Sequence, residues 1–167
     1  MVAPYRHERY RLIPLAPRAK LVCNRKLPSK LYLLITLNPT MADSKKYEIS
    51  VTSRVDYLPD QSDEGADRYV FSYTITITNT GTVGAQLISR HWIITDAEEH
   101  VQEVRGLGVV GEQPFLRPGE SFEYTSGSAI ATPVGTMRGS YQMAAEDGNK
   151  FDADIPEFTL SMPRILH

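Results

Sequence analysis

The chain has 167 residues, of which 41% are hydrophobic and 23% charged, and its formal net charge is −2. These values are typical of one globular domain, and the length is too short for two domains of ordinary size. The single cysteine, Cys23, excludes an intrachain disulfide and a metal site built from several cysteines. The longest apolar run, residues 31–37, is too short for a membrane-spanning helix, which needs about 20 such residues.

The small net charge hides a strong asymmetry along the chain. Residues 1–40 contain eight Lys or Arg and one acidic residue, whereas residues 41–167 contain ten Lys or Arg and nineteen Asp or Glu. Such a split indicates two segments of different origin or fate, a basic segment 1–40 and a domain 41–167.

Three interpretations of residues 1–40 compete. A signal peptide would use the run 31–37 as its apolar core, but the basic region before it is unusually long. A basic arm would bind nucleic acid or a membrane surface. We favour an appended tail that precedes the true start at Met41, because the polar residues after Met41 lead directly into a strand pattern. Such a tail, if translated, is expected to be largely disordered.

Alternation of apolar and polar residues is the dominant signal of the domain. Residues 69–78 place an aromatic and aliphatic row on one face and a mainly Ser/Thr row on the other, as expected for a half-buried strand. Similar patterns predict further strands at residues 47–52, 86–95, 100–104, 122–125, 137–144 and 151–155, with 158–161 extending the last one. Turns are predicted at residues 79–81, 96–99 and 147–149.

Seven or eight short strands without a convincing helix predict an all-β fold, an antiparallel β-sandwich. Its two sheets would bury the inward rows against each other. The residues expected in this core are Trp92, Phe71, Tyr73, Ile75, Phe122, Tyr141 and Phe151.

Residues 105–114 read RGLGVVGEQP, which contains a literal G-x-G-x-x-G pattern. This pattern binds a pyrophosphate when it joins a strand to a helix in a βαβ unit, but here a turn follows and no such unit is predicted. Either the glycines shape a loop or bulge at a sheet edge, or the backbone N–H groups of the loop converge on an anion. The candidate anion-binding residues are Gly106, Gly108, Gly111 and Arg105, with Arg90 and His91 on the strand expected beside them.

Longer motifs carry a resemblance to a known family. They are residues 57–62 (YLPDQS), 68–81 (RYVFSYTITITNTG), 90–96 (RHWIITD), 103–114, 116–127, 132–141 and 151–160. Together they resemble the ApaG family over essentially residues 41–167, and the first forty residues are outside the match. Leu107 departs from the family pattern, since a polar or acidic residue is expected there more often.

The resemblance implies a fibronectin type III-like or immunoglobulin-like β-sandwich in a bacterial cytoplasmic protein. It also implies an association with cobalt and magnesium efflux (CorD) and a pyrophosphate or nucleotide site at the glycine motif. We therefore expect a non-enzymatic binding module with an unidentified protein partner and no cofactor, nucleic acid or membrane span. The alternative is an accessory protein or enzyme of dinucleoside polyphosphate metabolism.

Other chemistry has weaker support in the sequence. Apart from His167 at the end of the sequence, His91 and His100 are the only histidines of the domain, and they form no closely spaced ligand pair, so no metal site is predicted. The acidic residues between 60 and 67 are interpreted as a solvated loop rather than a cation site. Residues 126–128 (SGS) lack the G-x-S-x-G pattern of a nucleophile elbow, and no catalytic residue is predicted.

Overall fold

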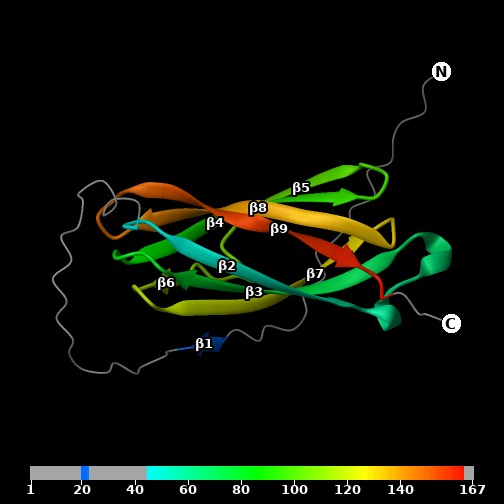
Figure 1. The fold of residues 1–167 in the computed structure, drawn as a ribbon, viewed down its shortest axis with the longest axis horizontal. Coiled ribbons are helices and arrows are strands. Elements are labelled where there is room, and N and C mark those ends of the chain that lie inside the picture. Colours follow the sequence, from blue (N-terminus) through cyan, green and yellow to red (C-terminus); the bar gives the residue numbers. More distant parts are fainter. Residues whose placement is uncertain (1–19, 23–44, 164–167) are drawn as a thin grey trace, which may run out of the picture.

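The alternating rows of the sequence become the two faces of β-strands, and the apolar rows lie between two sheets. The computed structural model describes residues 20–22 and 45–163. Figure 1 shows the two layers, with the strands of each running along the long axis of the molecule. The strands are β1 (Lys20–Val22), β2 (Ile49–Tyr57), β3 (Tyr69–Asn79), β4 (Ala85–Asp96), β5 (Val101–Leu107), β6 (Phe115–Leu116), β7 (Ser121–Ile130), β8 (Val134–Ala145) and β9 (Lys150–Ser161).

Both sheets are antiparallel throughout. The first has the order β1-β7-β3-β2, and the second has the order β5-β4-β8-β9, with β6 paired to β4 beside this path. Strands β2 and β9 contact each other across the two sheets and close one side of the sandwich. The predicted β-sandwich is confirmed, and the described strands beyond those predicted are the short β1 and β6.

The predicted core residues are buried, with one partial exception. Trp92 lies at the centre, with ring centroids 5.6 Å from Tyr73, 5.9 Å from Phe158 and 6.4 Å from Tyr141. Phe151 is only half-buried and packs against Tyr47, with ring centroids 5.4 Å apart. Each large apolar side chain contributes about 2–3 kcal/mol on burial.

One residue on the outer face of β3 is not open to solvent as the alternation predicts. Val70 lies on that face, but it is fully buried. The single-turn 3-10 helix Pro59–Gln61 packs against β3 at this end, and the Leu58 N–H donates to the Val70 carbonyl at 2.9 Å. The outer face of β3 is therefore covered where the sequence pattern alone left it open to solvent.

The last strand continues past a proline because of a bulge. In β9 the register against β8 shifts between the Met137–Phe158 pair and the Gly139–Ile155 pair, and Pro156 lies inside that shift. A proline has no N–H to give to a ladder, so it is tolerated at a bulge on an edge strand. The predicted extension of this strand to residue 161 is confirmed.

The proposed tail lies almost entirely outside the described residues. Only Lys20–Val22 is described there, as β1, which pairs with Ser121–Glu123 of β7. Within the described residues, no helix is long and apolar enough to cross a membrane.

Candidate functional site

The glycine motif forms the end of β5 and a tight hairpin turn. Gly106 and Leu107 belong to β5 itself, so the strand is longer than the sequence predicted. The turn is closed by two hydrogen bonds, from the Val109 N–H to the Glu112 carbonyl (2.8 Å) and from the Glu112 N–H to the Val109 carbonyl (2.9 Å). The two residues between them, Val110 and Gly111, both have positive φ, as a two-residue hairpin loop of type I′ requires.

Each glycine of the motif has a local structural reason. A Cβ at Gly106 would lie 3.0 Å from Nη1 of Arg90, and a Cβ at Gly108 would lie 2.2 Å from the Glu112 carbonyl oxygen. Gly108 and Gly111 have φ of 56° and 84°, the left-handed region that favours glycine. The glycines therefore make room for an arginine, allow a close backbone approach and complete a turn.

Most of the loop N–H groups already have acceptors. The Gly108 N–H donates to the Ile88 carbonyl at 2.9 Å, and Val109 and Glu112 donate to each other. Within residues 45–163, the N–H groups of Val110 and Gly111 donate to no protein acceptor. A ring of converging N–H groups is therefore not the main feature of this loop.

The half-buried side chain of Arg90 is the main feature instead. Its Nη1 donates to the carbonyl oxygens of Leu107 (3.1 Å) and Gly108 (2.6 Å), so the guanidinium lies over Gly106. No ion pair between described residues includes Arg90. Two backbone carbonyls therefore accept hydrogen bonds from the guanidinium, but no carboxylate among the described residues neutralises its charge.

Buried tyrosines lie on the same side of the sheet as Arg90. The hydroxyls of Tyr124 and Tyr141 share a 2.6 Å hydrogen bond inside the core. Burial raises the pKa of Tyr73, Tyr124 and Tyr141, and the positive charge of Arg90 opposes part of each rise. The tyrosines are therefore neutral hydroxyls that do not balance the arginine.

The remaining predicted residues lie on the opposite, outer face of the sheet. His91 follows Arg90 in β4, and its Nε2 is 2.8 Å from a carboxylate oxygen of Glu103. Arg105 contacts the same carboxylate at 3.4 Å. The hydrogen bond with His91, helped by the charge of Arg105, lowers the pKa of Glu103. Arg105 and His91 thus share the carboxylate of Glu103 in a polar cluster that is separate from Arg90.

Sequence reasoning grouped these residues but missed their separation into two faces. Neighbouring residues of a strand point to opposite sides, so the adjacency of Arg90 and His91, and of Arg105 and Gly106, was the available signal. Sequence reasoning also missed the tyrosine hydroxyls beside Arg90. Whether the loop binds an anion stays a prediction.

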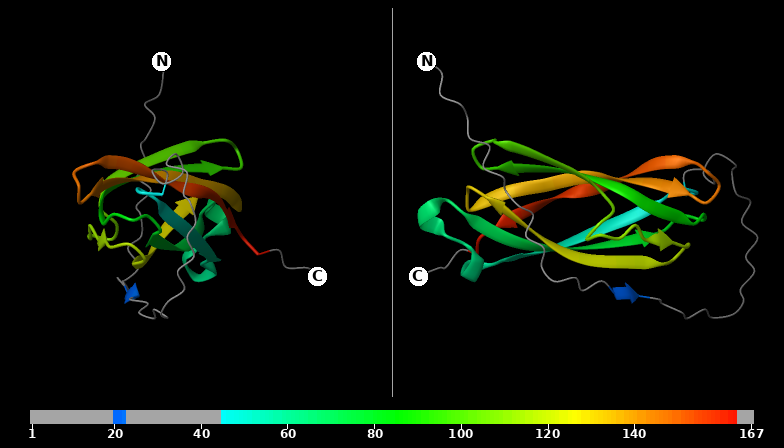
Figure 2. Two further views of the ribbon diagram at one scale, coloured as in Figure 1. Left: turned by 60° about the vertical axis from the view of Figure 1, so that its left-hand side comes forward. Right: turned by 180° about the vertical axis from the view of Figure 1, so that it is seen from behind.

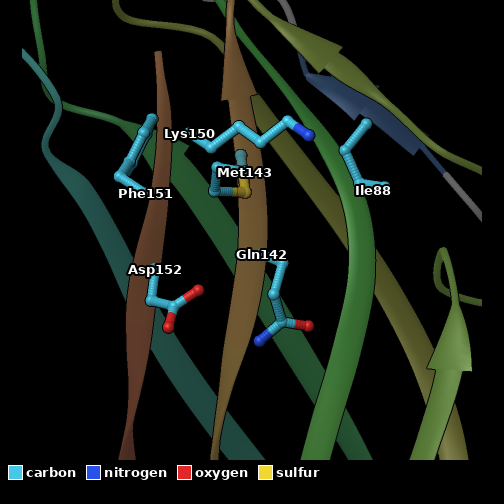
Figure 3. A pocket seen from close by; sticks show the side chains of 6 residues that line it. All are labelled: Ile88, Gln142, Met143, Lys150, Phe151 and Asp152. Atoms are coloured by element: carbon cyan, nitrogen blue, oxygen red, sulfur yellow. The ribbon is translucent and has the colours of Figure 1, made fainter.

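A shallow cavity of about 470 Å³ lies elsewhere, on β4, β8 and β9. Figure 3 shows the Lys150 side chain running over Met143 toward Ile88, while Gln142 and Asp152 lie below them on the neighbouring strands β8 and β9. Ile88 is at the bulge where the β4–β8 register shifts between Leu87 and Ser89. The cavity contains none of the residues predicted from the glycine motif.

The other candidate clusters do not form sites. The acidic loop contains two exposed single-turn 3-10 helices, Pro59–Gln61 and Glu64–Ala66. Across the described part of the chain, no three His, Cys, Asp or Glu side chains gather in a way that could hold a metal ion. His100 instead contacts Asp96 at 3.2 Å in the turn between β4 and β5.

Fold and site together define a class of protein, a small antiparallel β-sandwich whose edge hairpin is rich in glycine and is held by an arginine that has no carboxylate partner within residues 45–163. Residues 59–145 match the family model described as the ApaG domain. The chain therefore belongs to the ApaG family, as the sequence motifs had indicated.

Similar proteins extend this match over most of the chain. A protein of Thiobacillus denitrificans named Protein ApaG is 73% identical over 127 residues, which cover 76% of this chain and all of the relative. A protein of Nitrosospira multiformis with the same name is 71% identical over 127 residues, which again cover 76% of this chain and all of the relative. The crystal structure of an ApaA protein from Bordetella pertussis is 60% identical, with a TM-score of 0.70, covering 72% of this chain and 98% of that one.

Proposed function

We propose that this protein is a non-enzymatic binding module that recognises an anionic group at Arg90 and the Gly106–Gly108 segment. The observation that supports this proposal is the half-buried guanidinium of Arg90, which has no carboxylate partner among the described residues. A guanidinium offers five N–H donors in a planar fork that matches phosphate and carboxylate oxygens. Nη1 is occupied by two carbonyls, so the other nitrogens would hold the ligand.

The ligand group we propose is pyrophosphate, free or as part of a nucleotide. Arg90 would supply the charge, and the N–H groups of Val110 and Gly111 would be the backbone donors still available nearby. Arg105 would act only at a distance, because it is paired with Glu103 on the outer face. The anchor is therefore a side chain, with the glycines making room for it.

The association with cobalt and magnesium efflux would follow from recognition of a partner, not from metal carried by this chain. The described residues offer no cluster of three metal-ligating side chains for such a role. An unidentified protein partner that presents or releases the anionic ligand would connect ligand binding by this protein with cobalt and magnesium efflux.

Titration of the full chain with pyrophosphate and with ATP tests the proposal. The amide NMR signals of Gly106 and Gly108 and the Nε–H signal of Arg90 should shift at ligand concentrations up to about 10 mM. The variant Arg90→Gln should lose these shifts. The matched control Arg105→Gln removes a nearby arginine from the other face and should keep them.

Two results would contradict the proposal. One is an absence of shifts in the unaltered chain, and the other is unchanged binding in Arg90→Gln. Incubation with dinucleoside polyphosphates tests its non-enzymatic part. Hydrolysis products that follow the purified protein through purification would support the enzymatic alternative instead.

A further inference from the structure

Strand β5 is an open edge with few of the features that usually protect one. It ends the second sheet, and among the described residues no strand pairs with its outer side. Figures 1 and 2 show it at the border of the sandwich, on the hairpin that it forms with β4. Native proteins usually protect such an edge with Pro, charged side chains (above all Lys), a bulge or a covering segment. The seven residues of β5, VQEVRGL, contain neither Pro nor Lys, and the β4–β5 register has no shift. The two charged residues of β5, Glu103 and Arg105, have opposite signs, so they do not repel a second copy of the same strand.

The hydrogen bonds at the two ends of β5 show which of its groups are free. The Gly108 N–H donates to β4 at Ile88, and the Asp96 N–H donates to the His100 carbonyl. In an antiparallel pair, successive residues of a strand turn their N–H and C=O groups to alternate sides. The even-numbered residues of β5 therefore face β4, and the odd-numbered residues direct their backbone groups outward.

These odd-numbered residues form a self-complementary row. Val101 is 62% exposed and Leu107 is 76% exposed, and between them lie exposed Glu103 and Arg105. If two copies of β5 pair antiparallel about a twofold axis at Val104, Glu103 of each copy lies opposite Arg105 of the other. Val101 then lies opposite Leu107, so charged residues meet opposite charges and apolar residues meet apolar ones.

The same row disfavours the neighbouring registers. A shift of two residues in one direction places Glu103 opposite Glu103 of the other copy. A shift in the other direction places Arg105 opposite Arg105. Like charges directly opposite each other destabilise a strand pair, and a one-residue shift would pair groups that already bond to β4.

We propose that this protein forms a twofold-symmetric dimer in which the β5 strands of two copies pair antiparallel, centred on Val104. The β5-β4-β8-β9 sheet of one copy then continues into the same sheet of the other copy. The contact is isologous, so it closes after two copies and does not continue into fibres. Glu103 is already positioned for it by the 2.8 Å hydrogen bond with His91. Arg105 exchanges its 3.4 Å contact with Glu103 of its own strand for Glu103 of the other copy.

The dimer should be weak, because a single pair of seven-residue strands lies at the small end of protein interfaces. Sedimentation velocity and light scattering on the full chain, from about 10 µM to about 1 mM, should show a reversible monomer–dimer equilibrium. Hydrogen exchange at the Glu103 and Arg105 amides should slow as the protein concentration rises. The Val104 amide, which faces β4, should not change.

Charge exchange tests the register. The variants Glu103→Arg and Arg105→Glu each place like charges opposite each other and should raise the dimer dissociation constant about tenfold. The double variant E103R/R105E restores opposite charges and should dimerise like the unaltered chain. The control Arg54→Glu alters an equivalent same-strand ion pair on β2, where Arg54 lies 3.6 Å from Asp56, and should change nothing.

Three results would overturn the proposal. The first is a chain that stays monomeric at about 1 mM, and the second is a dimer dissociation constant that neither single variant changes. The third is a double variant that does not regain dimerisation although its circular dichroism and thermal unfolding show a native fold. None of these results bears on anion binding, because Arg90 lies on the other face of the sheet from the exchanged charges.

Discussion

Replacing Gly108 with alanine should strongly destabilise the fold. A Cβ at this position would lie 2.2 Å from the Glu112 carbonyl oxygen, and φ is +56°. The left-handed conformation costs a non-glycine residue about 1–2 kcal/mol. The carbonyl cannot move without opening the turn, which breaks the two hydrogen bonds between Val109 and Glu112 at about 1 kcal/mol each. Together these terms predict a loss of about 3–4 kcal/mol in the free energy of unfolding.

The matched comparison is Gly111→Ala in the same hairpin. Gly111 has φ of 84°, but a Cβ there would meet nothing within 4 Å, so only the conformational cost of about 1–2 kcal/mol applies. Equilibrium urea unfolding, followed by the fluorescence of the single tryptophan, Trp92, measures both free energies. Equal losses in the two variants, or a loss below about 1 kcal/mol for Gly108→Ala, would refute the steric argument.

Three further outcomes follow from pairs of polar groups. Tyr124→Phe or Tyr141→Phe leaves one buried hydroxyl of the 2.6 Å pair without a partner and should cost about 1–2 kcal/mol in urea unfolding, whereas the double variant should cost less than the sum. Hydrogen bonds from Tyr47 and Lys46 lower the pKa of Asp147 to about 2. The ionised carboxylate therefore stabilises the fold above about pH 4, and this contribution to the free energy of unfolding is lost as the pH falls toward about 2. The variant Asp147→Asn should remove that pH dependence from thermal unfolding curves. Replacing His91 with glutamine should raise the pKa of Glu103, measured by carboxyl-carbon NMR, because the hydrogen bond with His91 is the main cause of its lowering.

The strands could be predicted from sequence because apolar residues recur at every second position wherever one face of a strand is buried. Residues 69–78 gave β3 almost to its ends, and the turn at residues 147–149 lies between β8 and β9 as expected. Strand β7 was predicted too short, because its second half is made of small residues, Ser126 to Ala129, whose burial leaves no apolar alternation. The burial of Val70 could not be read from the alternation, because the loop between β2 and β3, not the opposite sheet, covers it.

The candidate site was harder to predict, because its geometry depends on contacts between strands. The sequence located the glycines and the arginines, but it could not show that the side chain of Arg90 occupies the space that a Cβ at Gly106 would need. It also could not show that the N–H groups of Val109 and Glu112 donate to each other's carbonyls within the turn and are therefore not available to a ligand. A pattern of three glycines is compatible with both an anion cradle and a hairpin, and only the register of β4 and β5 separates them.

The contact between β2 and β9 has a consequence for how the chain folds. These are the first strand after residue 45 and the last strand, and each belongs to a different sheet. Strand β3 pairs with β7, and β4 pairs with β8, so the central partners in both sheets are also distant in sequence. Such topologies fold on the millisecond-to-second scale, because long loops must close before non-local contacts stabilise them. During synthesis the sandwich therefore cannot close on this side until β9 has left the ribosome, and a chain that stops before Lys150 would leave the backbone edge of β8 unpaired and would lack the contact between β2 and β9.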